Sequence, residues 1–192
     1  MHAAFLEAAA PEPFRVLGRN LKPFTIGHQL LLERFESGYA VGSTVSPSWD
    51  DFIFSVWTCS QSYADVLKAL ASRVTLVRVY LWSKRCGKFD VREAQQFFNQ
   101  YLEANTSEPM YFYDDTKAGD ALGIPWGLYL KQMVQEKLHL NEAEAVNYPY
   151  RQASLLYLRQ LAERGMIKFG TDHDIALQEA AQRFNAQKVG RN

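Results

Sequence analysis

The chain has 192 residues, of which 47% are hydrophobic and 22% charged, and this composition excludes a disordered or low-complexity chain. Twenty-one basic residues balance 21 acidic ones, so net charge gives no reason to expect nonspecific binding to nucleic acid or to an acidic membrane. A chain of this length hides roughly 70% of its unfolded surface and needs neither disulfides nor a metal to fold.

The two cysteines, Cys59 and Cys86, are too few for a disulfide scaffold, and no CxxC pair or Cys/His cluster offers zinc ligands. We expect a cytoplasmic protein, because residues 1–10 lack the cationic and apolar stretches of a signal peptide. The most apolar segment, 74–82, contains Arg78 and is less than half the ~20 residues needed to cross a bilayer. We therefore expect no membrane contact, and no metal or cofactor.

Apolar residues at helical spacing predict a series of amphipathic helices after residues 1–13, a segment that we expect to be a flexible tether. The segment 74–82 suits a strand as well as a helix; we favour a helix, because no partner strand is evident nearby. The helices near residue 61 are expected to be separate or continuous with a kink. In the first half of the chain, helices are expected to begin at four capping residues: Thr25, Ser48, Ser62 and Asp90.

Residues 110–123 show no sustained period and predict a long loop, in which 110–113 can form a short extended piece. The helices that follow are expected to begin at Pro125, at Asn141, after the Tyr148-Pro149 step, and at Thr171.

Together these elements predict an all-α fold, with seven or eight helices packed as an irregular globular bundle and at most a short strand. Any subdomain boundary is expected in the loop 110–124. It would separate an N-terminal helical subdomain, 14–109, from a C-terminal helical subdomain, 125–192, and we expect the two to fold as one unit.

Motifs of catalysis are missing from the sequence, which has no GxSxG, GxxxxGK[ST], GxGxxG or HExxH pattern. We interpret each histidine as structural, His28 and His139 at helix ends and His173 between two acids that point in different directions on a helix. The acids Asp114, Asp115 and Asp120 can offer carboxylates to a divalent cation, but they lack the order of a calcium loop. Solvated loop acids are the better interpretation.

One basic cluster stands out, and it carries two hypotheses. Its cations surround Cys86 and can lower the pKa of that thiol, which would make it reactive, although no histidine partner makes it catalytic. Its aromatic residues can stack on exposed bases. The zero net charge favours instead a solvated cationic face of a helix. The cluster comprises Arg78, Tyr80, Trp82, Lys84, Arg85 and Lys88.

Aromatic residues make up 14% of the chain, which is more than a small domain can bury completely. Large rings also anchor interfaces between proteins. We expect some of four rings near predicted helix ends or loops to lie at the surface and contact a partner: Trp49, Tyr113, Tyr148 and Tyr150.

Three segments carry a resemblance to a known family. The segment LKPFTIGHQLLLE (21–33) resembles the L-x-P-[hydrophobic]-[ST]-[hydrophobic]-G-H motif of small helical proteins encoded in tail gene clusters of bacteriophages and prophages. Residues 51–60, ending in TCS, resemble the next helix of those proteins. LNEAEAVNYP (140–149), followed by a helix that runs into 163–165, is similar to their C-terminal half.

This resemblance implies a tail assembly chaperone, a non-enzymatic protein of the bacterial cytoplasm that coats the tape-measure protein and helps to deliver tail-tube subunits. Such a partner would place an i, i+3, i+4, i+7 face into a groove, and a homo-oligomer is compatible with the family. The motif implies no catalytic role for His28. The alternatives are a virion structural component, such as a connector or tail-completion protein, and a helical hydrolase that uses Asp114, Asp115 and Asp120.

Overall fold

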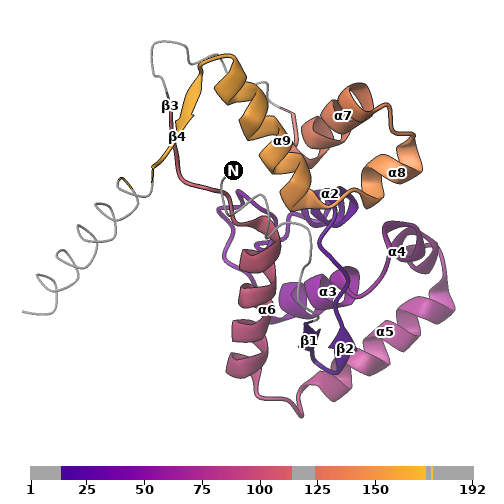
Figure 1. Ribbon diagram of the computed structural model, residues 1–192. Helices are drawn as coiled ribbons and strands as arrows, with labels where there is room; N and C mark the ends of the chain where they lie inside the picture. The colour runs from indigo at the N-terminus through magenta and orange to yellow at the C-terminus, as the bar shows by residue number, and fades with distance from the viewer. Residues whose placement is uncertain (1–13, 114–123, 172–173, 175–192) are drawn as a thin grey trace, which may run out of the picture. The chain divides into compact units, whose positions relative to one another are not determined.

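The computed structural model describes residues 14–113, 124–171 and 174, and helices make up most of this part of the chain (Figure 1), which confirms the all-α prediction. Two short antiparallel sheets join β1 (Arg15–Val16) to β2 (Arg19–Asn20) and β3 (Tyr111–Tyr113) to β4 (Ile167–Phe169). The helices are α2 (Ile26–Arg34), α3 (Trp49–Cys59), α4 (Tyr63–Leu70), α5 (Arg73–Cys86), α6 (Val91–Thr106), α7 (Trp126–Leu138), α8 (Glu142–Asn147) and α9 (Tyr150–Glu163).

The contacts within the chain divide it into two units, one of residues 1–107 and 122–157 and one of residues 108–121 and 158–192. The first unit holds α2 to α8 and the start of α9. The second holds the end of α9 and the sheet of β3 and β4. The division of the sequence into 14–109 and 125–192 stays a prediction about which parts fold together.

The predicted helix starts are confirmed where the structure describes them, because capping depends on a few neighbouring residues. Segment 74–82 is helical, and α3 and α4 are separate helices. Pro125 immediately precedes the first residue of α7. The Thr171 hydroxyl accepts a hydrogen bond from the Asp174 amide at 3.3 Å, but the helix predicted beyond it lies outside the described residues. Side chains of Thr25, Ser48, Ser62, Asp90 and Asn141 cap α2, α3, α4, α6 and α8.

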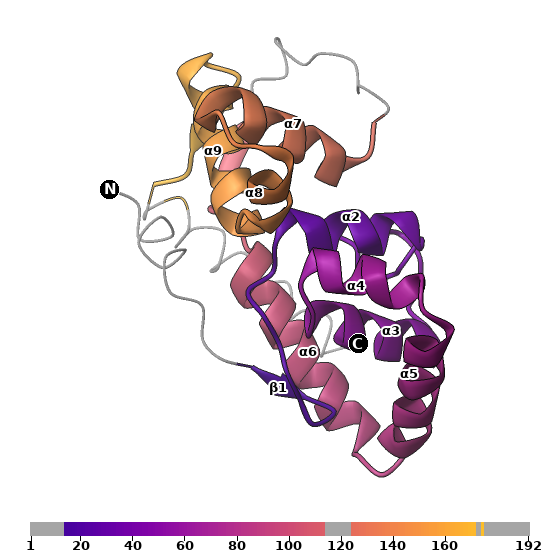
Figure 2. The same ribbon diagram turned by 90° about the vertical axis from the view of Figure 1, so that its right-hand side faces the viewer.

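Helix α2 is the central element of the first unit, since it contacts α3 and α4 as well as α7 and α8. Figure 2 shows it between these two pairs of helices. Its Ile26, Leu31 and Leu32 are fully buried. The chain around it is tied down by backbone bonds, because the Ile26 amide donates to Tyr148 O at 3.1 Å and the Tyr150 amide donates to Phe24 O at 3.0 Å.

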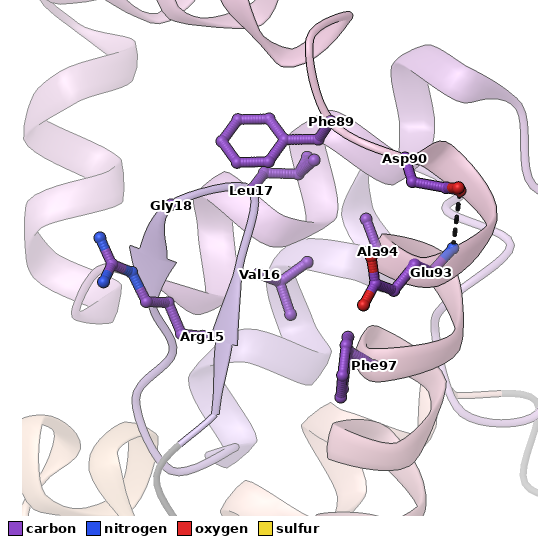
Figure 3. A pocket seen from close by; sticks show the side chains of 9 residues that line it. All are labelled: Arg15, Val16, Leu17, Gly18, Phe89, Asp90, Glu93, Ala94 and Phe97. Atoms are coloured by element: carbon purple, nitrogen blue, oxygen red, sulfur yellow. Dashed lines mark hydrogen bonds between the residues drawn. The ribbon is translucent and has the colours of Figure 1, made fainter.

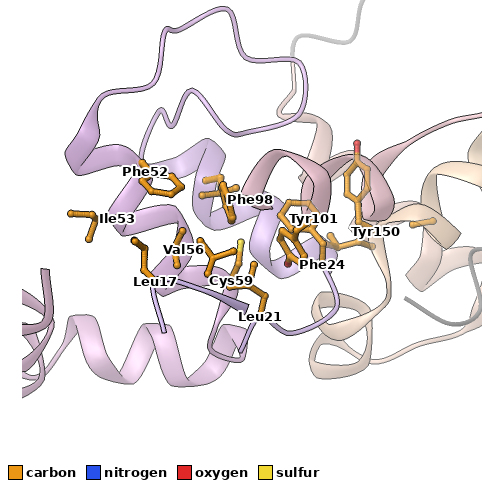
Figure 4. Packing of buried hydrophobic residues seen from close by; sticks show 14 of the residues in the cluster. Leu17, Leu21, Phe24, Phe52, Ile53, Val56, Cys59, Phe98, Tyr101 and Tyr150 are labelled. Atoms are coloured by element: carbon orange, nitrogen blue, oxygen red, sulfur yellow. The ribbon is translucent and has the colours of Figure 1, made fainter. Parts of the chain in front are cut away.

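Aromatic rings fill the core of the first unit (Figure 4). The Phe24 ring lies 5.5 Å from that of Tyr150 and 6.3 Å from that of Tyr101, and both pairs meet edge to face, an arrangement that adds to the free energy of burying each ring. The Tyr101 hydroxyl donates to Lys22 O at 2.9 Å, so its polar atom is satisfied although the ring is buried.

A carboxylate from α2 supports the start of α7, which Pro125 does not cap with a side chain. Both oxygens of Glu33 accept from the Gly127 amide, at 2.9 and 3.2 Å, and Gln29 Nε2 donates to Glu33 Oε1 at 2.8 Å. An anion in this position is favoured by the free amides and the dipole of a helix N-terminus. Glu33 therefore connects α2 to α7.

Replacing Glu33 with alanine should lower the free energy of unfolding by about 1–2 kcal/mol, because a partly buried charge-assisted bond at a helix start is lost. Urea unfolding followed by circular dichroism measures the change. Glu136→Ala removes an equal charge from an exposed position in the last part of α7 and should change stability by less than about 0.5 kcal/mol. Equal effects of the two variants would contradict the capping role of Glu33.

Candidate partner-binding surface

An open groove of about 320 Å³ lies in the first unit between the β1–β2 hairpin and the start of α6 (Figure 3). Three of its apolar side chains, those of Val16, Leu17 and Ala94, are buried in the core. Two others, Phe89 and Phe97, are each 45% exposed. The groove therefore combines a fixed apolar base with two large rings that are available to a partner.

The hairpin turn places Leu17 at the base of this groove. Leu17 and Gly18 have φ angles of 49° and 77°, and a two-residue loop with both φ angles positive matches the twist of a hairpin. A leucine in this region costs roughly 1–2 kcal/mol, which burial of its side chain offsets. Glycine carries no such cost at position 18, where an added Cβ would lie 3.5 Å from the Phe89 ring.

The polar residues of the groove do not form a catalytic set. Asp90 Oδ1 accepts from the Arg92 and Glu93 amides at 2.9 and 3.1 Å, so this carboxylate is committed to the start of α6. Arg15 and Glu93 are exposed, and the residues that line the groove include no histidine, serine or cysteine. The groove is thus suited to apolar contact with a charged rim of both signs.

The four aromatic residues singled out in the sequence lie in different environments. Tyr150 is fully buried, so the expected surface position is wrong for this residue; its hydroxyl accepts from Trp126 Nε1 at 2.8 Å, and its ring packs on Phe24. Trp49 and Tyr148 are half-buried against the core. Tyr113 belongs to β3, and its side chain lies outside the described residues. A role of these residues in partner binding stays a prediction.

The three acids of the hydrolase alternative, Asp114, Asp115 and Asp120, lie outside the described residues, as does His173. Among the residues that the structure does describe, no three His, Cys, Asp or Glu side chains come together as a metal site. His139 ends α7 with a φ of 55°, the helix-terminal position that its sequence context predicts.

His28 is buried and holds two parts of the first unit together. Its Nδ1 accepts from the Thr25 amide at 3.0 Å, so Nε2 carries the proton and donates to Gln61 O at 2.9 Å. The Thr25 hydroxyl in turn accepts from the His28 amide at 3.4 Å, which completes a capping box. Burial lowers the pKa of His28 from 6.5 to about 4, so the ring is neutral at pH 7.

Both thiols are buried, and this corrects the hypothesis of a reactive Cys86. Burial raises the pKa of Cys86, and the nearby Arg19 guanidinium only partly counters this effect. Its Sγ donates to Trp82 O at 3.4 Å. Its sequence neighbours Lys84, Arg85 and Lys88 are exposed to solvent. Burial raises the pKa of Cys59 to about 12, as its interpretation as a small buried hydrophobe predicts.

The basic cluster lies on α5 and just beyond it. Arg78, Lys84 and Arg85 are exposed, which matches a solvated cationic face. Trp82 is not available for stacking on bases, because it packs inward with Val79 and the Arg19 guanidinium lies 4.2 Å from its ring centre.

The sequence does not single out the groove, because Phe97 and Phe98 both fit the helical spacing of apolar residues in 91–101. Adjacent helical residues point about 100° apart, so only one of them can face the core. Phe98 is buried and Phe97 is exposed. A helical projection predicts that one ring of the pair points outward. The hairpin that forms the opposite wall cannot be predicted in this way, because its strands have two residues each and are too short for an alternating pattern.

Comparison of the chain with protein-family models, with curated proteins and with solved structures finds no match. Among the described helices, none has the length and apolar character needed to span a membrane.

Proposed function

We propose that this chain is a non-enzymatic binding protein, and that the groove between the β1–β2 hairpin and α6 receives apolar side chains from a helical partner protein. The observation that carries the proposal is the exposure of Phe89 and Phe97 beside a buried apolar base. Exposed rings cost free energy in water, and aromatic residues in apolar depressions are the usual centres of protein interfaces.

A helix is the favoured partner element because the groove is short and open at its surface. Its volume of about 320 Å³ suits a small number of side chains at i and i+3 or i+4, as in other helix-in-groove complexes. Arg15 and Glu93 at the rim can orient such a helix through opposite charges.

The resemblance of residues 21–33 to proteins of phage tail gene clusters supports a role in tail assembly, with the tape-measure or tail-tube protein as the partner. That segment supplies the approach to α2 and most of α2 itself, the helix that contacts four others in the first unit. A motif at this central helix would specify the same fold of the first unit in this chain and in those proteins. The proposed setting is the cytoplasm of a bacterial host.

The double variant Phe89→Ser, Phe97→Ser should weaken partner binding by about 30-fold or more, because the loss of even one hot-spot side chain costs at least about 2 kcal/mol. The chain is co-expressed with a phage tape-measure protein or tail-tube protein, and copurification is followed by a titration. Phe112→Ser is the matched control, since Phe112 is an exposed ring of the second unit, and it should leave binding unchanged.

A chain that binds neither protein would contradict the proposed role in tail assembly. Binding that survives loss of both phenylalanines would contradict the groove as its site. Mass spectrometry of purified virions separates a chaperone from a structural component, because a chaperone leaves the particle and a component remains in it.

A further inference from the structure

The outward face of α5 is an apolar stripe that the chain leaves uncovered. Val74, Val77 and Leu81 are 64%, 58% and 55% exposed, and their i, i+3, i+7 spacing places them on one side of the helix. The opposite side packs inward through Val79 and Trp82. Of the fourteen residues of α5, only Cys86 is fully buried.

This stripe, which we call the α5 stripe (Val74, Val77 and Leu81), is bordered by cations on both sides. At about 100° per residue, Arg78 and Arg85 fall along one border, and Arg73 and Lys84 fall along the other. Residues 66–89 contain six Lys or Arg residues and no Asp or Glu. The surface therefore favours a partner that is apolar at its centre and acidic at its rim.

A surface of that kind exists elsewhere on the same unit. A pocket of about 410 Å³ lies where the end of α2, the following segment and the start of α3 meet, and none of its lining residues comes from α5. Its apolar part includes Phe35 and Val45, which are 44% and 54% exposed. Lysine and arginine do not occur among the residues that line it, whereas Glu36, Asp50 and Asp51 do. We call it the acidic pocket.

The acidic pocket is held open by bonds within its wall. Asp51 Oδ2 accepts from the Gly38 amide at 2.8 Å, and a Cβ at Gly38 would lie 2.5 Å from Val45 O, so only glycine permits this close packing of the segment. The Phe35 and Phe54 rings meet at 4.7 Å. A pocket that is already formed loses little conformational entropy when it binds a partner.

We infer that the chain associates with itself head to tail, with the α5 stripe of one copy in the acidic pocket of the next. The two surfaces are complementary in charge and both expose apolar side chains. The net charge of zero adds no overall repulsion between copies. Because the two surfaces differ, a pair of bound copies still presents one free α5 stripe and one free acidic pocket, and the assembly continues as a ring or an open chain.

The test uses the full chain and two charge-reversal variants. The cation variant carries Arg78→Glu and Arg85→Glu, and the acid variant carries Glu36→Lys and Asp50→Lys; Asp51 is left intact because it holds Gly38. Sedimentation of the wild-type chain should show a mass that rises with concentration and falls with added salt, which screens the charged rim. Each variant alone should remain a monomer, with a melting temperature that shows it is folded.

Mixing the two variants restores opposite charges between a stripe and a pocket, although each variant keeps its own substitutions. The acid variant's intact α5 stripe meets the cation variant's intact acidic pocket, and the reversed stripe and the reversed pocket are again opposite in charge, so an equal mixture should assemble with the two variants alternating. Lys137→Glu with Arg164→Glu, an equal charge change at exposed positions outside both surfaces, should assemble as the wild type does. Phe89→Ser with Phe97→Ser should also assemble, which separates this inference from the proposed function.

Three results would overturn the inference. One is a wild-type chain that is monomeric at every concentration, and another is a mixture of the two variants that stays monomeric. The third is a monomeric wild-type chain whose α5 cations bind single-stranded RNA, an interaction that the cation variant loses. That outcome would assign the face to nucleic acid instead.

Discussion

Lowering the pH from 7 to 4 should remove about 3 kcal/mol of stability through His28 alone, because one pKa unit corresponds to about 1.4 kcal/mol. Burial lowers the pKa of His28 from 6.5 to about 4. Between these values the unfolded chain binds a proton that the folded chain does not. The stability that depends on a neutral His28 is therefore fully present above pH 6.5 and is lost as the pH falls through 4.

The loss has a structural cause that a variant can isolate. A proton on Nδ1 would face the Thr25 amide, which now donates to that atom at 3.0 Å, so a charged ring loses its acceptor role as well as its solvation. Glutamine at position 28 preserves a standard capping box with Thr25 but does not titrate, and it lacks the rigid ring that directs Nε2 at Gln61 O. His28→Gln should cost about 1–2 kcal/mol at pH 7.

Urea unfolding of the wild type and of His28→Gln at a series of pH values measures this contribution. Acidic residues titrate in both proteins, so the difference between the two curves reports His28. The wild type should lose its advantage between pH 6.5 and 4, and the variant should become the more stable protein at the acid end. Parallel curves would show that His28 is not held neutral by the fold.

The parts of the fold that follow from the sequence are those with local causes. A serine or asparagine that caps a helix acts on amides two or three residues away, and the predicted caps of α2, α3, α4, α6 and α8 are confirmed. The second hydrogen bond of a capping box, in which the side chain three residues on accepts from the amide of the cap residue, also depends on other partners of that side chain. In such a box Asp51 would accept from the Ser48 amide, but its carboxylate accepts instead from Ser55 on the same helix and from the Gly38 amide, which the segment before α3 brings to it.

Contacts that depend on residues far apart in sequence are the ones that the sequence does not indicate. The Cys86 environment depends on Arg19 and on packing of α5, and its sequence neighbours predicted the opposite direction of its pKa. Tyr150 follows a loop in sequence, yet Phe24 and Trp126 enclose it. Helical spacing predicts α5, but it does not predict which apolar side of that helix the rest of the chain leaves exposed.

The same limit applies to the candidate surfaces. The groove is assembled from Phe89 and Phe97 together with a hairpin some 70 residues earlier in the chain, and the acidic pocket needs Gly38 to bring Val45 back to α3. The 21–33 motif, by contrast, contains the residues that begin α2 and set its packing. Thr25 and His28 form the capping box, and Gly27 sets the distance between helices.

Replacing Gly27 with alanine should lower the free energy of unfolding by about 2 kcal/mol, and valine should cost more. A Cβ at this position would lie 2.8 Å from Val146 O and 2.8 Å from Tyr63 Cβ. Neither atom belongs to the free end of a flexible side chain, so α2 must move away from α4 and α8. The loss exceeds the gain of about 1 kcal/mol that alanine brings to a helix.

Gly87→Ala is the matched control for this prediction, because it makes the same substitution where nothing lies within 4 Å of the new Cβ. Gly87 has a φ of −62°, which alanine adopts without strain, so this variant should be neutral or more stable by about 0.4–1 kcal/mol. Thermal and urea unfolding of both variants give the comparison. If Gly27→Ala is as stable as Gly87→Ala, α2 does not approach Tyr63 of α4 and Val146 of α8 as closely as the distances at Gly27 indicate. Gly27 would then have no packing role in the 21–33 motif.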